Sequence, residues 1–283
     1  MKHLPAVKDK KFLTTYKIKT FRSTIYSHYR LNGRIFPWRQ TRNPYYILVS
    51  EIMLQQTQTE RVLKKYAHFI KVFPDISSLN RASLHKVLEV WQGLGYNRRA
   101  LALKKIAQIV TRNFDGTIPP FPDTLQTFPC VGKATASAIC AFAFNKPVVF
   151  IETNIRSVFI HFFFRDIPVI GDTEIFPLIE ETLDLENPRE WYFALMDYGA
   201  MLKKIKPNPG NQSAHYHRQS PFEDSDRQIR GIILRILIEK SHLLEDEIVE
   251  ELQKNRKRIK RILMELEHEG FIMRKNGGFQ LCE

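Results

Sequence analysis

The spacing of apolar residues is the feature that most restricts the fold of this chain. From Leu13 to about Lys204 apolar residues recur at helix spacing, as in YILVSEIMLQQ (46–56), LHKVLEVWQGLG (84–95) and ALKKIAQIVTRNF (102–114). This spacing places them on one face of an α-helix, and glycine or proline separates the segments. Strand-like alternation is scarce, so the sequence predicts an all-α domain over residues 1–205.

A polar segment and a different pattern follow this domain. Residues 206–225 are rich in Pro, Gly, Asn and Ser, which is typical of a linker or an extended strap. Residues 226–283 predict three helices and then two short strands about an Asn-Gly-Gly turn. Three helices followed by a hairpin is the order of a small winged helix–turn–helix domain.

Charge points to the helical domain as the binder of any polyanion. The 283-residue chain has a formal net charge of +13, although many basic proteins bind nothing acidic. Residues 224–283 hold 12 basic and 12 acidic side chains, so the excess lies in residues 1–223. The basic cluster KNRKRIKR (254–261) opens the last predicted helix, where a recognition helix would meet phosphates. A solvated helix start is an equally good explanation of this cluster.

The sequence favours a reduced, intracellular protein. The first residues lack the apolar stretch of a secretory signal, and no run of about 18 apolar residues could span a membrane. Cys130, Cys140 and Cys282 have no paired spacing, which predicts neither disulfides nor a cysteine-held metal. His215 and His217 lack a third ligand nearby, so no metal site is expected there. A cytoplasmic location is the expectation.

The segment LQTFPCVGKATASAICAF (125–142) contains a helix–hairpin–helix pattern. Backbone N–H groups at the start of its second helix can hold a phosphate, and Lys133 adds a positive charge beside them. Cys130 stands where the pattern has its first glycine, which narrows the dihedral angles open to the turn. Packing alone could also explain such a hairpin. The pattern is matched by Pro129, Val131, Gly132, Thr135 and Ala136.

Two carboxylates stand out because apolar residues surround them. Glu51 lies on the apolar helical face of SEIMLQQTQT (50–59), where an unpaired buried carboxylate would be costly. Glu51 must therefore have a partner or a chemical task. Glu152 follows the apolar stretch VVFI (148–151), and Thr153 and Asn154 can hydrogen-bond to it.

Taken together, six segments resemble the helix–hairpin–helix (HhH-GPD) DNA glycosylase superfamily, most closely the A/G-mismatch adenine glycosylases of the MutY group. The resemblance covers roughly residues 20–204 and implies an enzyme of base excision repair. Such an enzyme binds double-stranded DNA, extrudes a mispaired or damaged base and hydrolyses its N-glycosidic bond. The segments are FPWR (36–39), NPYYILVSEIMLQQTQT (43–59), VWQGLGYNRRA (90–100), the hairpin, ETNIRSV (152–158) and MDYGAM (196–201).

The resemblance implies catalytic roles for three side chains. Glu51 would be the general acid that protonates the departing purine, because an acid in an apolar pocket keeps its proton near neutral pH. Glu152 would stay ionised to stabilise or attack the cationic sugar, with Asn154 to orient it. The family has aspartate at this position. The extra methylene of Glu152 moves the carboxylate by about 1.5 Å, against a catalytic tolerance of ~0.5 Å.

Other side chains are implied to bind the DNA. Gln56 would wedge into the gap left by the extruded base, with Gln55 supporting it, although a polar solvent face is the alternative. Arg34, Phe36 and Trp38 precede this helix where the family builds its base pocket, although a lone tryptophan is more often core. The full set of implied DNA contacts is Gln55, Gln56, Asn97, Arg98, Pro129, Val131, Gly132, Lys133 and Thr135.

The sequence departs from the adenine enzymes in features beyond Glu152. The four cysteines that hold their 4Fe–4S cluster are missing after MDYGAM, so no cofactor is expected. Asn97 replaces a tyrosine associated with reading 8-oxoguanine, and the predicted winged helix replaces a larger C-terminal domain. Ala134 occupies the place of the Schiff-base lysine of endonuclease III-like lyases. Lys133 lies one residue earlier, about 100° around the helix, and is expected to bind phosphate.

These observations predict a monofunctional DNA glycosylase that removes a mispaired or modified base, with adenine favoured. A thymine or uracil mismatch glycosylase is a second hypothesis, which Asn97 favours and the LQQTQ string opposes. A DNA-binding regulator that kept the fold and lost catalysis is a third, and Glu152 in place of aspartate is its best support.

Overall fold

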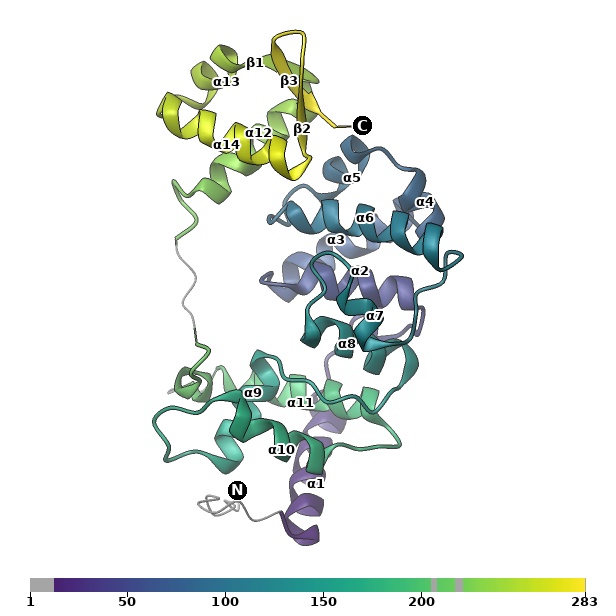
Figure 1. Ribbon diagram of the computed structural model, residues 1–283. Helices are drawn as coiled ribbons and strands as arrows, with labels where there is room; N and C mark the ends of the chain where they lie inside the picture. The colour runs from purple at the N-terminus through teal and green to yellow at the C-terminus, as the bar shows by residue number, and fades with distance from the viewer. Residues whose placement is uncertain (1–12, 205–207, 217–220, 283) are drawn as a thin grey trace. The chain divides into compact units, whose positions relative to one another are not determined.

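The computed structural model describes residues 13–204, 208–216 and 221–282, and its backbone is mostly helical, as the sequence predicts (Figure 1). Within these ranges no helix has the length and apolar character needed to cross a membrane. The helices are α1 (Thr15–Asn32), η1 (Pro37–Arg39), α2 (Pro44–Leu54), α3 (Thr59–Val72), α4 (Ile76–Arg81), α5 (Leu84–Trp91), α6 (Arg98–Asn113), α7 (Pro122–Gln126), α8 (Lys133–Phe144), α9 (Thr153–Phe163), α10 (Asp172–Thr182), α11 (Pro188–Leu202), η2 (Pro209–Gln212), α12 (Asp226–Lys240), α13 (Glu245–Leu252) and α14 (Arg256–Glu269). The strands are β1 (His242–Leu244), β2 (Ile272–Lys275) and β3 (Gly278–Leu281).

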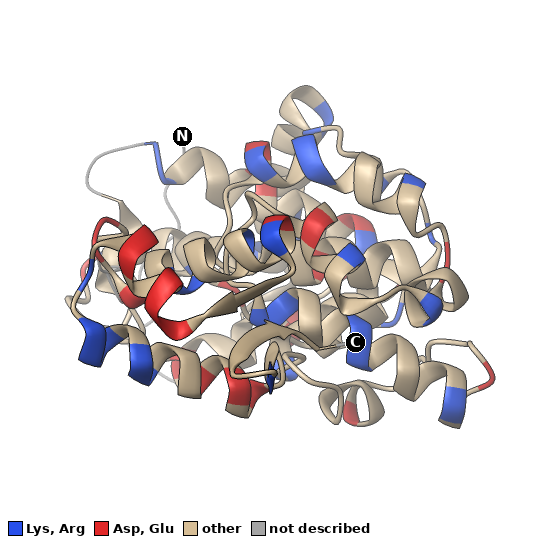
Figure 2. Cartoon of the chain, turned by 90° about the horizontal axis from the view of Figure 1, so that it is seen from above, with Lys and Arg blue, Asp and Glu red and all other residues tan. Residues whose placement is uncertain are grey.

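Contacts between residues divide the chain into two compact units. Unit 1 consists of Met1–Ile47, Pro120–Gln126 and Val131–Arg218. Unit 2 consists of Leu48–Pro119, Thr127–Cys130 and Gln219–Glu283. The units interleave along the chain, whereas the sequence predicts consecutive domains; the boundaries at residues 205 and 226 stay a prediction. Lysine and arginine residues are spread over many of the helices (Figure 2).

Aromatic side chains fill the core of unit 1. Phe21 of α1 meets Phe159 and Phe163 of α9 and Trp191 of α11 edge to face, with ring centroids 5.4, 5.2 and 5.7 Å apart. Such pairs contribute about 0.5–1.5 kcal/mol each beyond their buried area. Most of the run SVFIHFFF (157–164) therefore lies in the buried helix α9.

Helices α3 to α6 make up the first part of unit 2. Helix α6 packs on α4 and α5, and α3 packs on α5. Trp91 is fully buried at the end of α5, and its indole N–H donates to the carbonyl of Gly95 at 3.1 Å. This hydrogen bond ties the helix end to the GLGYN loop (93–97).

The C-terminal part of unit 2 has three helices and a hairpin, in the order that the sequence predicts. The short strand β1, too brief to show alternation in the sequence, adds to the hairpin in the antiparallel order β1-β3-β2. Asn276 and Gly277 have φ angles of +48° and +74°, as a type I′ turn requires. Ile229 of α12, Ile259 of α14 and Phe279 of β3 are buried in its core. Its assignment to the winged-helix class stays a prediction.

The middle of the polar segment lies against unit 1. Residues 208–216 contain η2, which packs on α9, and Ile170 exchanges backbone hydrogen bonds of 2.9 Å with Gln212 and Ala214. This part of the predicted linker is thus a strap. Residues 205–207 and 217–220, and with them His217, lie outside the described residues.

Candidate active site

Glu51 lies in the last turn of α2, among buried neighbours. The side chains of Ser50, Ile52 and Met53 are at most 1% exposed, whereas Glu51 is half-buried. Burial of these neighbouring side chains fixes the position of α2, and the half-buried carboxylate of Glu51 remains partly accessible to solvent. Glu51 is thus half-buried at the end of a buried helix, and the apolar pocket expected around its carboxylate stays a prediction.

The glutamine turn (55–58) follows directly after α2. Gln56 is exposed and has a left-handed backbone with φ of +51°, which residues other than glycine rarely adopt. Gln55 donates from its amide Nε2 to the carbonyl of Cys130 at 2.9 Å. Cys130 has a φ of +60°, in the hairpin position where the family pattern has glycine. The turn is therefore anchored by Gln55 and presents Gln56 to solvent.

Arg99 holds the glutamine turn from inside unit 2. Its side chain is buried, and Nη1 donates to the carbonyls of Ile52, Met53 and Gln55 at 3.1, 2.8 and 2.5 Å. Nη2 donates to Thr57 Oγ1 at 3.0 Å and to the Gly95 carbonyl at 3.0 Å. The guanidinium thus occupies the carbonyl end of α2, where the helix dipole favours a cation, and joins it to the GLGYN loop.

Sequence reasoning missed Arg99. The available signal was an arginine on the buried stripe of α6, in line with Leu103, Ile106 and Val110. Burial lowers the pKa of Arg99 to about 10, so the side chain remains charged at neutral pH. Among the described residues, the acceptors of its hydrogen bonds are carbonyl oxygens and one hydroxyl, and none is a carboxylate.

Two predicted DNA contacts, Asn97 at the end of the GLGYN loop and Arg98 directly after it, differ in their surroundings. Asn97 is half-buried at the start of α6. Arg98 forms a bidentate ion pair with Glu269 of α14, with N–O distances of 2.7 and 2.6 Å. Glu269 also accepts from Arg230 of α12 at 2.6 Å. Arg98 is thus engaged with the C-terminal part of unit 2, a partner that the sequence did not indicate.

The hairpin has the local form that the sequence predicts. Helix α8 begins at Lys133, and its N-cap Gly132 provides no side-chain hydrogen bond to the helix. Val131 is buried and Pro129 half-buried, whereas Lys133 is exposed and Thr135 half-buried. An exposed helix start without a capping side chain leaves N–H groups available to a phosphate. Phosphate binding here stays a prediction.

Glu152 caps helix α9 and is held by three donors. Its Oε1 accepts from the backbone N–H groups of Asn154 and Ile155 at 2.8 and 2.9 Å, and its Oε2 accepts from Asn154 Nδ2 at 3.1 Å. All three contacts are donated to the carboxylate, as suits an ionised group. The predicted pair of Glu152 and Asn154 is therefore in contact.

Gly199 lets α11 approach the start of α9 closely. A Cβ atom at Gly199 would lie 2.3 Å from the carbonyl oxygen of Asn154, so no side chain fits. This contact joins the segments ETNIRSV and MDYGAM. Lys203, one turn later, lies near enough that the charge of Glu152 acts on it; burial lowers the pKa of Lys203, against the raising effect of Glu152.

The predicted base-pocket residues form a cluster around a buried aspartate. Arg34 donates to Asp197 from its backbone N and its Nε, both at 2.7 Å, and Arg39 donates from Nη1 and Nη2 at 2.9 and 2.8 Å. Phe36 stacks on Trp38 with ring centroids 5.0 Å apart, and Trp38 is buried. Sequence reasoning missed Asp197 and Arg39, although both stand in the quoted segments MDYGAM and FPWR.

The side chains in the described ranges do not fit an iron–sulfur cluster or another metal centre. Cys130, Cys140 and Cys282 lie in the hairpin turn, inside α8 and after β3, so they provide no cluster ligand set. Among the described residues no group of three or more His, Cys, Asp or Glu could hold a metal ion. His215 lies 3.7 Å from Asp172, which is bound by Arg156 at 2.7 Å.

The predicted residues thus form two groups. Glu51, Gln55, Gln56, Asn97 and Arg98 belong to unit 2, and Gln55 contacts Cys130 of the hairpin there. The base-pocket residues, Glu152, Asn154 and the start of α8 belong to unit 1. The pairing of Glu51 with Glu152 as catalytic partners stays a prediction.

The chain is similar to known base excision DNA repair proteins. Residues 49–182 match the HhH-GPD superfamily of base excision DNA repair proteins. The adenine DNA glycosylase of Buchnera aphidicola subsp. Baizongia pistaciae is 37% identical over 194 residues, which cover 67% of this chain and 54% of that protein. The chain therefore spans about half the length of this relative.

Two further similarities involve enzymes named for pyrimidines. The thymine/uracil-DNA glycosylase of Methanothermobacter thermautotrophicus is 32% identical over 195 residues, which cover 67% of this chain and 87% of that protein. The solved structure of a thermostable thymine-DNA glycosylase aligns with a TM-score of 0.61 at 26% identity, over 69% of this chain and 92% of that one.

Proposed function

The chain belongs to the HhH-GPD superfamily of base excision DNA repair proteins, and from this premise we propose that it is a monofunctional DNA glycosylase. Its substrate is double-stranded DNA that contains a mispaired or modified base, most readily adenine. The reaction is hydrolysis of the bond between the extruded base and deoxyribose. The adenine DNA glycosylase that is 37% identical supports the choice of adenine.

One observation carries the proposal. A half-buried acid, Glu51, ends a buried helix one turn before an exposed glutamine with a strained backbone, and Arg99 holds that turn by several hydrogen bonds. Strained backbone persists only where its surroundings impose it, and it concentrates at functional sites. The enzyme must first extrude the base and then protonate it. Both steps require a side chain that replaces the base and a proton donor, held in fixed positions relative to each other, as Gln56 and Glu51 are here.

The proposed reaction uses the two carboxylates in different protonation states. Glu51 gives its proton to a ring nitrogen of the base, and the electron pair of the breaking glycosidic bond goes to the departing base. The ionised Glu152 stabilises the positive charge that develops on the sugar. Water then adds to the sugar carbon, and the proton that it loses restores the acid form of Glu51, which leaves an abasic site. Helix α9 donates two N–H groups that hold Glu152 in place for this role.

DNA contacts are assigned by the same reasoning. Gln56 fills the space of the extruded base, and the start of α8 with Lys133 binds a phosphate. Phe36 and Trp38, stacked on each other, line the base pocket. We also propose that the chain works without an iron–sulfur cluster. It lacks lyase activity because Ala134, not a lysine, follows Lys133 in α8.

The proposal is tested by base release from duplexes that contain adenine opposite 8-oxoguanine or guanine. Wild-type chain should release free adenine and leave an alkali-labile abasic site. Glu51→Gln should lower the single-turnover rate by roughly 10²–10⁴-fold, the usual contribution of a general acid, with nearly unchanged DNA binding. Glu60→Gln, an exposed glutamate in the first turn of α3, is the matched control and should keep full activity. Full activity of the Glu51 variant would remove Glu51 from the mechanism.

A thymine or uracil mismatch glycosylase is the second candidate function. The observation that favours it is the thymine/uracil-DNA glycosylase relative, of which this chain covers 87%. A panel of duplexes with thymine or uracil opposite guanine, assayed beside the adenine duplexes, separates the two functions by the base released. Release of no base from any duplex, together with tight binding, would instead support the catalytically inactive regulator.

A further inference from the structure

A groove of about 1350 Å³ lies in unit 2. The glutamine turn and the GLGYN loop line it together with α12, the first helix of the C-terminal part. Small-molecule sites usually have volumes of about 300–1,000 Å³ and apolar linings. This groove is larger, and glutamine, asparagine and arginine side chains line it together with apolar ones such as Leu88, Leu94 and Ile232. Its size therefore fits a polymer better than a small ligand.

The charges along the groove are mostly positive and partly unneutralised. Arg61 of α3 and Arg235 of α12 line it, and both side chains are exposed. Of the residues that the structure describes, none forms an ion pair or hydrogen bond with the side chain of either arginine. The acids at the groove, Asp226 and Glu265, are paired with arginines of α14 and α12. Two free arginines therefore remain for an anionic partner.

Other lining side chains have the chemistry of nucleic-acid contacts. Gln56 and Asn97 present amides, which can donate to and accept from base edges. Phe222, which is 60% exposed, offers an aromatic face on which a base can stack. Arginines beside amides and an aromatic ring favour a nucleic-acid strand over an acidic protein segment.

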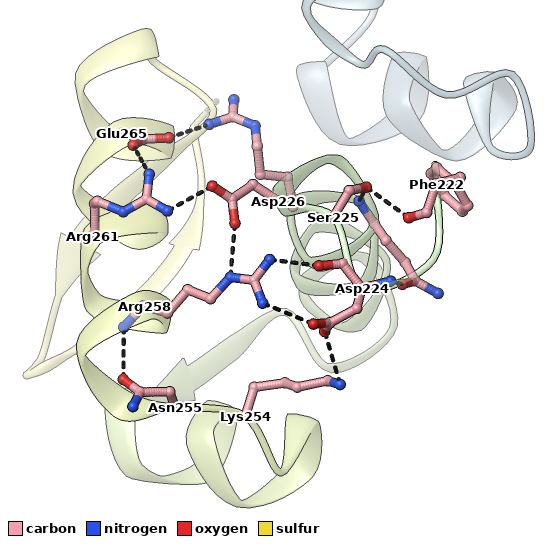
Figure 3. A network of polar contacts seen from close by, with 11 residues as sticks. Phe222, Asp224, Ser225, Asp226, Lys254, Asn255, Arg258, Arg261 and Glu265 are labelled. Carbon is pink, nitrogen blue, oxygen red and sulfur yellow. Dashed lines mark hydrogen bonds and ion pairs between the residues drawn. The ribbon is translucent and has the colours of Figure 1, made fainter. Parts of the chain in front are cut away.

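The basic cluster of α14, by contrast, is largely neutralised within the C-terminal part (Figure 3). Arg258 and Arg261 bind Asp226 at 2.8 and 2.6 Å, and Lys254 binds Asp224 at 3.0 Å. Cations at a helix start are unfavourable, and the acids at the start of α12 offset them. Only Lys257 and Lys260 of the cluster are exposed without such a partner among the described residues. The hypothesis that this cluster meets phosphates as a recognition helix is therefore disfavoured.

We propose that α12 is one wall of a DNA-binding groove, and that a DNA strand occupies the groove with phosphates on Arg61 and Arg235. The C-terminal part then contributes to DNA binding through α12 and not through α14. The inference rests on the proposed function, because the glutamine turn is the part of the groove nearest the chemistry. Glu269 binds both Arg98, next to the GLGYN loop, and Arg230 of α12. This shared carboxylate holds α12 beside the loop.

The test compares two double variants of the full chain that lose the same charge. Arg61→Ala/Arg235→Ala removes the free arginines of the groove, and Lys257→Ala/Lys260→Ala removes the free lysines of α14. Binding to an undamaged, labelled duplex is measured by fluorescence anisotropy over a series of salt concentrations. The groove variant should lose roughly tenfold in affinity per arginine at 0.1 M salt, and its salt slope should fall by about 1 per arginine. The α14 variant should change by less than about twofold.

Three results would overturn the groove assignment. They are unchanged binding by the groove variant, an equal or larger loss in the α14 variant, and tighter binding of an RNA duplex with the same arginine dependence. Both variants replace exposed side chains, so thermal unfolding should match that of the wild type and exclude misfolding. Base release is assayed separately on the wild type. A chain that releases no base but shows arginine-dependent DNA binding refutes the proposed function alone, whereas base release with arginine-independent binding refutes the groove alone.

Discussion

At the scale of single residues, the buried Arg99 decides where the glutamine turn lies. A carboxylate partner would neutralise its charge, but Arg99 uses the carbonyl oxygens at the end of α2. Each carbonyl deprived of its donor in a buried place costs about 1–3 kcal/mol, so the arrangement is sensitive to the loss of this one side chain.

Replacement of Arg99 tests this role. Arg99→Leu should lower the free energy of unfolding by about 3 kcal/mol, because several buried carbonyls lose their donor together. The rate of base release should fall by more than the decrease in the folded fraction accounts for, because Arg99 no longer holds the backbone of Gln56. Urea unfolding and single-turnover assays provide the two measurements. Arg112→Leu, an exposed arginine of the same helix, should leave both unchanged. Equal free energies of unfolding for Arg99→Leu and Arg112→Leu would contradict the structural role given to Arg99.

At the scale of elements, the fit of α11 against α9 determines the position of Glu152. The carboxylate is fixed to the first turn of α9, and that turn is fixed by its contact with Gly199 of α11. The family has aspartate where this chain has Glu152. In this chain the carboxylate of Glu152 folds back on the start of its own helix and caps it.

A methyl group at Gly199 tests this contact. In Gly199→Ala, Cβ would lie 2.3 Å from the carbonyl oxygen of Asn154, so the helices must separate. We expect a loss of about 1–3 kcal/mol in the free energy of unfolding, together with reduced base release. In Gly231→Ala of α12, nothing lies within 4 Å of the new methyl group, and stability should rise by about 0.5–1 kcal/mol. The interpretation fails if both variants are stabilised.

At the scale of the whole molecule, ion pairs that are wholly or partly buried contribute to the dependence of stability on pH. Burial raises the pKa of Asp197, but hydrogen bonds and charges from Arg39 and Arg34 outweigh it and hold the pKa below its ordinary value. The pKa of Asp172 is lowered chiefly by its hydrogen bond to Arg156. A carboxyl group whose pKa is lower in the folded state than in the unfolded state stabilises the fold. Its contribution to the free energy of unfolding is fully present at pH values above the unfolded-state pKa of about 4, and it disappears as the pH falls through the folded-state pKa.

The free energy of unfolding should therefore be level between about pH 5 and 7 and fall below about pH 4. Asp197→Asn should lower it by about 3 kcal/mol at pH 7, because Arg39 is left buried without a counter-charge, and should make the acid decline shallower. Asp166→Asn, at an exposed position, should reproduce the wild-type curve. Urea titrations at a series of pH values measure these curves. An acid decline as steep in Asp197→Asn as in the wild type would exclude Asp197 as a source of it.

Local features of this chain could be predicted because they depend on neighbours along the chain. The start of α8 at Lys133, the capping of α9 by Glu152 with Asn154, and the turn at Asn276 and Gly277 all involve residues within a few positions. Long-range partners could not be predicted. Arg98 with Glu269, Arg99 with the end of α2, and Asp197 with Arg34 join residues 171, 46 and 163 positions apart. One sequence does not tell which distant charge each will meet.

The sequence by itself determined the helical class, the hairpin and the superfamily, because apolar period, turn chemistry and long motifs are properties of the linear order of residues. Only the tertiary structure decided which charges are neutralised. The basic cluster of α14 and the arginines of α12 look equally cationic in the sequence. Folding pairs most of the first set with aspartates and leaves Arg235 exposed, since a charge remains available to a partner only where no opposite charge packs against it.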